Sequence, residues 1–308
     1  MKMIEVQNLT KKFNGKTILN GISFEVKEGE IFGFLGPNGA GKTTTMKIIL
    51  GLLKPTSGNA LVFGKNLGDN DDLRRRVGVL LENDGLYEHL SAYENLNYYA
   101  QLYSVSEIED KIKELLEFVD LSERQNDKVG TFSRGMKRRL ALARSIIHDP
   151  EVLFYDELSS GLDPEAQKMV RNLILCLSEG KGKTIFLNSH DLDEVERTCS
   201  RIAILQKGEI RAYDTIENLR EKSSKSAVEI ALTSNEEVDK ALILLKSLDY
   251  VSECQQDDLK VTAIMKGEET STVLSVLMKE GIKVEEVKRA RSLEDIYLDI
   301  VGQSEGKI

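Results

Sequence analysis

The sequence is poor in cysteine and has no long apolar run, and each lack excludes a class of protein. Its three cysteines, Cys176, Cys199 and Cys254, are far apart and form no CxxC pair. Neither a disulfide framework nor a zinc site is therefore expected, and a reducing cytosol fits. No stretch approaches the roughly 18 apolar residues that a membrane-spanning helix needs. Any membrane role is expected to come through a partner.

An excess of positive charge is also missing. The 308 residues include 42 Lys and Arg against 51 Asp and Glu, a formal net charge of −9. A general nucleic-acid binder needs positive surface to replace the counterions on phosphates, so no nucleic-acid partner is expected. The basic runs 74–76 and 137–139 are interpreted as solvated helix faces or partner contacts. The first 13 residues have no apolar segment behind their charges, and we expect no signal peptide there.

Over its first two-thirds the sequence contains short apolar runs that alternate with helical patterns. Each run is interpreted as a buried strand. A helix is predicted behind Asp163, as its N-cap, and Pro164, at its first position. Alternation of this kind predicts a parallel sheet covered by helices, which is the α/β class. The predicted strands are 31–35, 77–80, 152–155, 184–187 and 202–205.

Between about residues 85 and 150 the alternation stops and only helical patterns remain. Ser91 and Glu94 form a capping box at the start of one helix, and residues 108–119 form a second amphipathic helix. We expect a helical subdomain here. Its tyrosines fit an interface, where tyrosine is enriched, or packing inside the subdomain. They are Tyr87, Tyr93, Tyr98, Tyr99 and Tyr103.

The composition changes near residue 221. Residues 221–226 are polar and are interpreted as a linker. Residues 227–308 are predicted to form a small α+β domain. Its patterns follow the order strand, helix, strand, strand, helix, strand, which is that of a ferredoxin-like unit. A last helix is expected over 292–301.

The most specific motif is GxxxxGK[ST] at residues 36–43, directly after a predicted strand. Its glycines let backbone N–H groups turn inward around a polyphosphate, and the following helix directs its positive end at the same anion. Lys42 can reach the β- and γ-phosphates, and the Thr43 hydroxyl can ligate Mg²⁺. We therefore expect ATP and Mg²⁺ to bind here. The predicted nucleotide-binding residues are Gly36, Pro37, Asn38, Gly39, Ala40, Gly41, Lys42, Thr43 and Thr44.

Two adjacent carboxylates end the apolar strand at 152–155. Asp156 suits a contact with Mg²⁺, and Glu157 can polarise an attacking water as a general base. The pair favours hydrolysis. A GTPase is disfavoured because no NKxD sequence is present to read guanine.

Three further motifs resemble those of ATP-binding-cassette (ABC) ATPases. Residues 132–136, Phe-Ser-Arg-Gly-Met, resemble the signature motif, residues 159–163 the D-loop, and residues 188–190 the switch-histidine segment. Phe13 resembles the aromatic residue that stacks on adenine. The resemblance covers residues 3–220 and implies a P-loop NTPase fold of the ABC ATPase type. Residues 1–220 would then be the ATPase domain, with the helical subdomain inside it.

The resemblance also implies roles for residues of these motifs. Ser133 and the N–H of Gly135 would donate to the γ-phosphate held by an opposing subunit, so that a second ABC ATPase subunit completes the site. His190 would contact the γ-phosphate and orient the water beside Glu157. Asp163 would serve both as a helix N-cap and as a D-loop contact.

Three positions depart from the family pattern. Glu82 stands where glutamine is usual and is interpreted as a further Mg²⁺ ligand, although it adds negative charge near the γ-phosphate. Arg134 replaces a signature glycine, and Leu158 replaces a proline. These three departures resemble the variants found in cassettes that work with ABC-2-type exporters. Residues 292–298 resemble the closing helix of the accessory domain in drug and bacteriocin export cassettes.

The resemblance implies an ATP-hydrolysing subunit that powers a separately encoded ABC-2-type permease, most naturally an exporter of a drug or antimicrobial peptide. Its expected place is cytoplasmic, peripheral on the inner face of the cell membrane. Import stays open, as does pairing with an identical or a different cassette. Two other classes also stay open. One is a soluble cassette acting on a ribosome, and the other is a module that binds ATP without useful hydrolysis.

Overall fold

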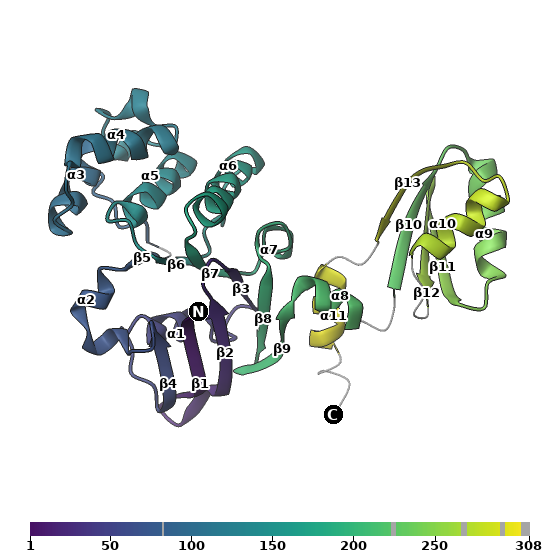
Figure 1. Ribbon diagram of the computed structural model, residues 1–308, viewed down its shortest axis with the longest axis horizontal. Helices are drawn as coiled ribbons and strands as arrows, with labels where there is room; N and C mark the ends of the chain where they lie inside the picture. The colour runs from purple at the N-terminus through teal and green to yellow at the C-terminus, as the bar shows by residue number, and fades with distance from the viewer. Residues whose placement is uncertain (82, 223–225, 266–269, 290–292, 303–308) are drawn as a thin grey trace. The chain divides into compact units, whose positions relative to one another are not determined.

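The computed structural model describes residues 1–81, 83–222, 226–265, 270–289 and 293–302 (Figure 1). The chain divides into two compact units, Met1–Asp214 and Thr215–Ile308. None of the helices within the described ranges is both long and apolar enough to cross a membrane.

A six-stranded sheet lies at the centre of the first unit. Its strand order is β5-β6-β7-β3-β8-β9, and the first five of these strands run parallel. The parallel strands are almost wholly buried, as expected for a sheet with two covered faces. All five predicted strands are confirmed. The bounds are β3 (Ile31–Leu35), β5 (Val77–Leu80), β6 (Val152–Asp156), β7 (Thr184–Ser189), β8 (Arg201–Gln206) and β9 (Glu209–Thr215).

A second, antiparallel sheet was not anticipated from the sequence. It has the order β2-β1-β4 and is formed by β1 (Lys2–Phe13), β2 (Lys16–Lys27) and β4 (Ser57–Val62). Its strands mix buried and exposed positions, as in a sheet with one solvated face. Phe24 of β2 stacks on Phe32 of β3 with ring centroids 5.4 Å apart. Side chains of both sheets and of α1 (Lys42–Ile49) therefore share one hydrophobic cluster.

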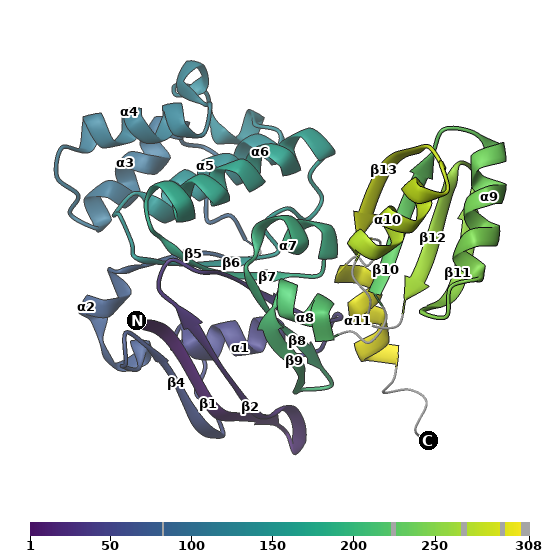
Figure 2. The same cartoon turned by 45° about the vertical axis from the view of Figure 1, so that its right-hand side comes forward.

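The predicted helical subdomain is present as α3 (Ala92–Leu102), α4 (Ile108–Phe118) and α5 (Arg134–Ile146), which contact one another. Figures 1 and 2 show these helices gathered on one side of the first unit. Both sides of the expected capping box are formed by Ser91 and Glu94. The remaining α-helices in the described part of this unit are α2 (Asp71–Arg74), α6 (Pro164–Leu175) and α7 (Leu192–Thr198).

The second unit contains an antiparallel sheet with the order β11-β12-β10-β13. Its elements follow the predicted order, and the fold is ferredoxin-like. Helices α9 and α10 contact each other and the sheet. Buried side chains of these helices and of the sheet form a separate hydrophobic core. The bounds are α8 (Ile216–Lys222), β10 (Ser226–Leu232), α9 (Asn235–Lys246), β11 (Val251–Asp257), β12 (Lys260–Met265), α10 (Thr270–Lys279), β13 (Val284–Arg289) and α11 (Leu293–Gly302).

Candidate active site

A pocket of about 630 Å³ opens where β3, β6 and β7 end. The carboxyl ends of parallel strands are where α/β sheets usually bind ligands. The pocket brings together most of the residues that the sequence predicts for the site. These are Phe13, Pro37, Asn38, Gly39, Gly41, Lys42, Thr43, Thr44, Asp156, Glu157 and His190.

The loop between β3 and α1 depends on glycine. Gly41 has a φ of +114° and is the N-cap of α1, and a Cβ there would lie 2.6 Å from Leu19 Cδ2. A Cβ on Gly36 would overlap the carbonyl oxygen of Leu205. Neither position admits a larger residue without displacement of a neighbour. Ala40 is buried beneath the loop, where its N–H donates to the carbonyl of Pro37.

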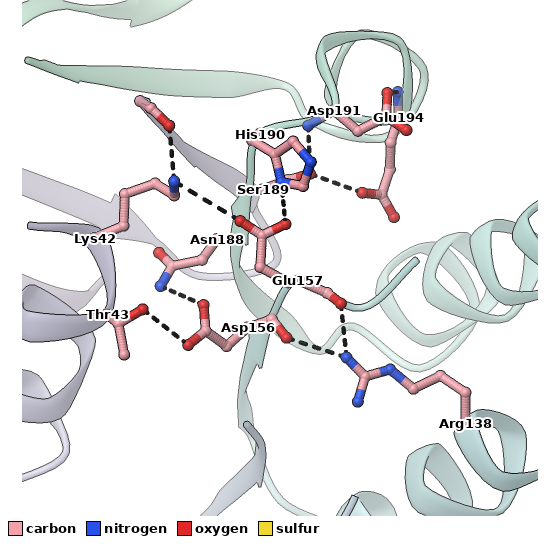
Figure 3. A network of polar contacts seen from close by, with 11 residues as sticks. Lys42, Thr43, Arg138, Asp156, Glu157, Asn188, Ser189, His190, Asp191 and Glu194 are labelled. Atoms are coloured by element: carbon pink, nitrogen blue, oxygen red, sulfur yellow. Dashed lines mark hydrogen bonds and ion pairs between the residues drawn. The ribbon is translucent and has the colours of Figure 1, made fainter. Parts of the chain in front are cut away.

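Lys42 is directed into the pocket although only 7% of its surface is exposed. Its ammonium donates to the carbonyl of Gly36 over 2.7 Å and lies 3.7 Å from Oε1 of Glu157 (Figure 3). A cation held at the mouth of a glycine loop is suited to a polyphosphate.

Asp156 lies at the end of β6 with both carboxylate oxygens in contact with neighbours. Thr43 Oγ1 donates to Asp156 Oδ2 over 3.2 Å, and Asn188 Nδ2 donates to Oδ1 over 3.0 Å (Figure 3). A hydroxyl beside a carboxylate is the oxygen donor set that Mg²⁺ takes in nucleotide sites, so these residues fit the ion. Asn83 faces the same pair in an adjoining pocket. Glu82, the other predicted ligand, lies outside the described residues.

Glu157 is held in an uncommon backbone conformation, with a φ of +52°. Its N–H donates to the carbonyl of Asn188 over 2.9 Å. Its Oε2 lies 2.6 Å from Nδ1 of His190, so the two sequence-predicted catalytic residues are in direct contact. A carboxylate paired with an imidazole can accept a proton from water.

The segment that carries His190 contacts a buried carboxyl, that of Glu194. Ser189 donates to Glu194 over 2.9 Å, and the N–H of Asp191 donates to Ser189 over 3.0 Å. Burial raises the pKa of Glu194, an effect that hydrogen bonds from Ser159 and Ser189 partly oppose. Glu194 therefore links the segment that carries His190 to the start of the D-loop-like segment.

Ser133, Gly135 and Asp163 lie outside this pocket. Ser133 caps α5 by accepting from the N–H of Met136 over 3.2 Å, and Gly135 packs against Ala166. Asp163 caps α6, as predicted from the sequence, by accepting from the N–H of Ala166 over 2.9 Å. The structure does not place these three beside Lys42 and Glu157 of the same chain.

Arg138 and Asp84 also line the pocket, and neither was predicted from the sequence as a residue of the site. Arg138 was interpreted as part of a solvated or partner-facing basic run, which is wrong, because only 7% of its surface is exposed and it lines the pocket. Arg138, Ala141, Leu142 and Ser145 are all buried and follow helical spacing. That shared face was the available signal.

The strand–loop–helix with Lys42 and Thr43, together with the acidic end of β6, defines a P-loop nucleotide hydrolase. A family model described as ABC transporter matches residues 19–160. The chain is 36% identical over 310 residues to an uncharacterized ABC transporter ATP-binding protein, YhcH, of Bacillus subtilis, with 99% of this chain and 98% of the relative covered. The chain belongs to the family of ABC transporter ATP-binding proteins, and it is an ATPase.

Two further similarities concern transport and assembly. A fluoroquinolones export ATP-binding protein of Mycobacterium tuberculosis is 32% identical over 305 residues, which are 98% of this chain and 94% of that protein. The dimeric post-hydrolysis structure of the ATP-binding cassette MJ0796, bound to ADP and Pi, matches with a TM-score of 0.63 and 28% identity. That match covers 70% of this chain and 99% of the other.

Proposed function

We propose that this chain powers an exporter whose ABC-2-type permease is a separate polypeptide. The observation that carries the ATP-driven part is the convergence of Lys42, Glu157 and His190 in one pocket. The direction of transport is supported by the similarity to a fluoroquinolones export protein over nearly the whole chain, including the second unit. A drug or an antimicrobial peptide is the proposed class of cargo.

In this proposal the polyphosphate of ATP lies along residues 36–43, where loop N–H groups and the Lys42 ammonium face it. Phe13, which is 43% exposed at the pocket and has the Lys11 ammonium 4.7 Å from its ring centroid, stacks on adenine. Thr43 and Asp156 would hold Mg²⁺, which when bound neutralises charge on the phosphates.

Hydrolysis starts from the Glu157–His190 pair. Glu157 accepts a proton from water while the water oxygen bonds to the γ-phosphorus. The bond from that phosphorus to the bridging oxygen breaks, which leaves ADP and phosphate. His190 orients the water and contacts the γ-phosphate, and Lys42 stabilises the developing charge.

A second cassette completes the site in this proposal. Ser133 is exposed at the N-terminus of α5, outside the pocket of its own chain. A hydroxyl and the N–H groups at a helix start suit the γ-phosphate of an opposing subunit. Support comes from the dimeric assembly of MJ0796. Asp163 would contact the partner from the start of α6, and the partner is either an identical or a different cassette.

The permease would contact the helical subdomain and hold the chain at the inner face of the cell membrane. Tyr87 and Tyr98 are 38% and 45% exposed, with ring centroids 5.1 Å apart. Aromatic side chains presented in this way are enriched in protein interfaces. Tyr99 instead donates to the carbonyl of Gly85 over 2.6 Å and has a packing role.

The proposal is tested by purifying a tagged Glu157→Gln variant from native membranes with ATP present and identifying the proteins that accompany it. We expect a multi-span membrane protein in stoichiometric amount. The Lys42→Ala variant, purified in parallel, controls for recovery that does not depend on ATP. Recovery of ribosomes, or of soluble proteins alone, would contradict the exporter.

A further inference from the structure

The guanidinium of Arg138, a residue of α5, donates hydrogen bonds to two other segments of the ATPase unit. Its Nε donates to the carbonyl of Leu158 over 2.7 Å, and its Nη2 donates to the carbonyls of Glu157 over 2.7 Å and Asp156 over 3.2 Å. Its Nη1 donates to Asp84 Oδ1 over 2.6 Å and to the carbonyl of Leu81 over 3.4 Å. The arginine itself belongs to α5 of the helical subdomain.

Three successive carbonyls, at residues 156–158, leave the end of β6 and accept from this one side chain. Figure 3 shows the contacts to Asp156 and Glu157. Glu157 lies in the middle of them with a φ of +52°, a conformation that a glutamate adopts only when its surroundings impose it. Arg138 donates to all three carbonyls, and the carbonyl of Glu157 also accepts from the N–H of Ser160 over 3.3 Å. Arg138 thus contacts the backbone of the turn from which the Glu157 carboxylate reaches Lys42 and His190.

Arg138 also contacts residues that lie between β5 and the helical subdomain in the chain. Asp84 balances the buried charge of Arg138, and a buried cation that loses its anionic partner is costly. Asp84 and Arg138 also both line the nucleotide pocket. One rigid planar group therefore joins Leu81, Asp84 and α5 to the turn that carries Glu157.

We propose that Arg138 is a positioning residue, which holds Glu157 in its hydrolytic orientation and makes that orientation depend on Asp84 and on the helical subdomain. The proposal rests on the proposed role of Glu157 as general base. Because the permease is proposed to contact the helical subdomain, this residue gives its binding a physical route to the hydrolytic group.

Arg139 provides a matched control on the same helix. It donates to the carbonyls of Val119 over 2.7 Å and Asp120 over 3.0 Å, and to the Asp120 carboxylate over 3.3 Å. These contacts anchor α5 to the end of α4, and Arg139 does not line the pocket. Its loss therefore tests what a structural arginine of α5 contributes.

The test uses the purified full-length chain and its Arg138→Gln, Arg138→Lys, Asp84→Asn and Arg139→Gln variants. For each, kcat and KM for ATP, ATP affinity and the unfolding temperature are measured. We expect Arg138→Gln to lower kcat about tenfold to a hundredfold, as misplacement of a reacting group does, with ATP affinity nearly unchanged. Arg138→Lys should restore part of the loss. Arg139→Gln should lower stability without lowering kcat.

The two sides of the contact are tested together. Asp84→Asn should lower kcat in the same direction, and the Arg138→Gln/Asp84→Asn double variant should lose less than the product of the single losses, as residues in one network do. Undiminished kcat in Arg138→Gln, an equal loss in Arg139→Gln, or multiplicative losses in the double variant would each overturn the proposal. If Arg138→Gln does not fold, Asp84→Asn decides by the same criterion. Glu157→Gln is assayed alongside, because its failure to lower kcat would refute the proposed function instead.

Discussion

His190 Nδ1 lies 2.6 Å from Glu157 Oε2, while Lys42 Nζ lies 3.7 Å from Oε1 of the same carboxylate. One carboxylate is thereby held between an imidazole and an ammonium. Lys42 begins α1, Glu157 directly follows β6, and His190 directly follows β7. Their contact exists because those parallel strands end at one edge of the sheet.

Glu157→Gln keeps the size of the side chain but removes the proton acceptor. We expect phosphate release to fall by about 10² to 10⁴, the usual contribution of a general base. ATP affinity should stay within a few-fold of the parent value because Lys42 and the loop are unchanged. Phosphate release and binding of a fluorescent ATP analogue check this. Normal turnover in this variant would exclude Glu157 as the base.

His190→Ala removes the imidazole from Glu157. We expect kcat to fall about tenfold to a hundredfold, since an orienting group is lost while the base remains. His89, which is exposed and does not line the pocket, gives the matched control. The His89→Ala variant should hydrolyse ATP at the parent rate. Equal losses in the two variants would show that the His190 effect is unspecific.

Gly78→Ala tests the packing of α5 against β5. A Cβ on Gly78 would overlap the carbonyl oxygen of Ser145 and lie 2.6 Å from Leu153 Cδ2. Overpacking of this kind costs about 1–3 kcal/mol of unfolding free energy, to be measured by urea denaturation. Gly180→Ala, where only Cys176 Sγ at 3.8 Å is near, should change stability by less than about 0.5 kcal/mol. Similar losses in both would contradict this account.

His148 makes stability depend on pH. Burial lowers the pKa of its imidazole, which stacks on Tyr103 at 3.9 Å and lies 3.1 Å from the carbonyl of Val77 through Nε2. Its buried Nδ1 has no hydrogen-bond partner within the described residues. Protonation would therefore place a donor where no acceptor lies.

The unfolded chain binds a proton to this imidazole at higher pH than the folded chain does. The unfolding free energy should therefore fall as pH falls below about 6.5, until the lowered folded-state pKa is passed. Urea denaturation between pH 5.5 and 8 measures the slope. The His148→Gln variant should have a flatter slope in this window, and an unchanged slope would rule out His148 as its source.

The nucleotide-binding loop at residues 36–43 and the acidic pair 156–157 could be predicted from the sequence because each depends on residues that are adjacent in the chain. A glycine loop between a strand and a helix positions its own N–H groups, and a strand that ends in two carboxylates brings them to the sheet edge. The helix caps Ser91 and Asp163 are local for the same reason, since each side chain bonds a backbone group three residues on.

The antiparallel sheet and the role of Arg138 required the tertiary structure. β1 pairs with β4, about fifty residues later in the chain, and no local pattern specifies that register. Whether an arginine in a basic run faces water or the protein depends on acceptors that other segments supply. For Arg138 those acceptors come from Leu81, Asp84 and residues 156–158, which follow the paired strands β5 and β6. The chemistry of the loop and of the acidic pair follows from neighbouring residues, whereas long-range packing sets which charges are buried beside them.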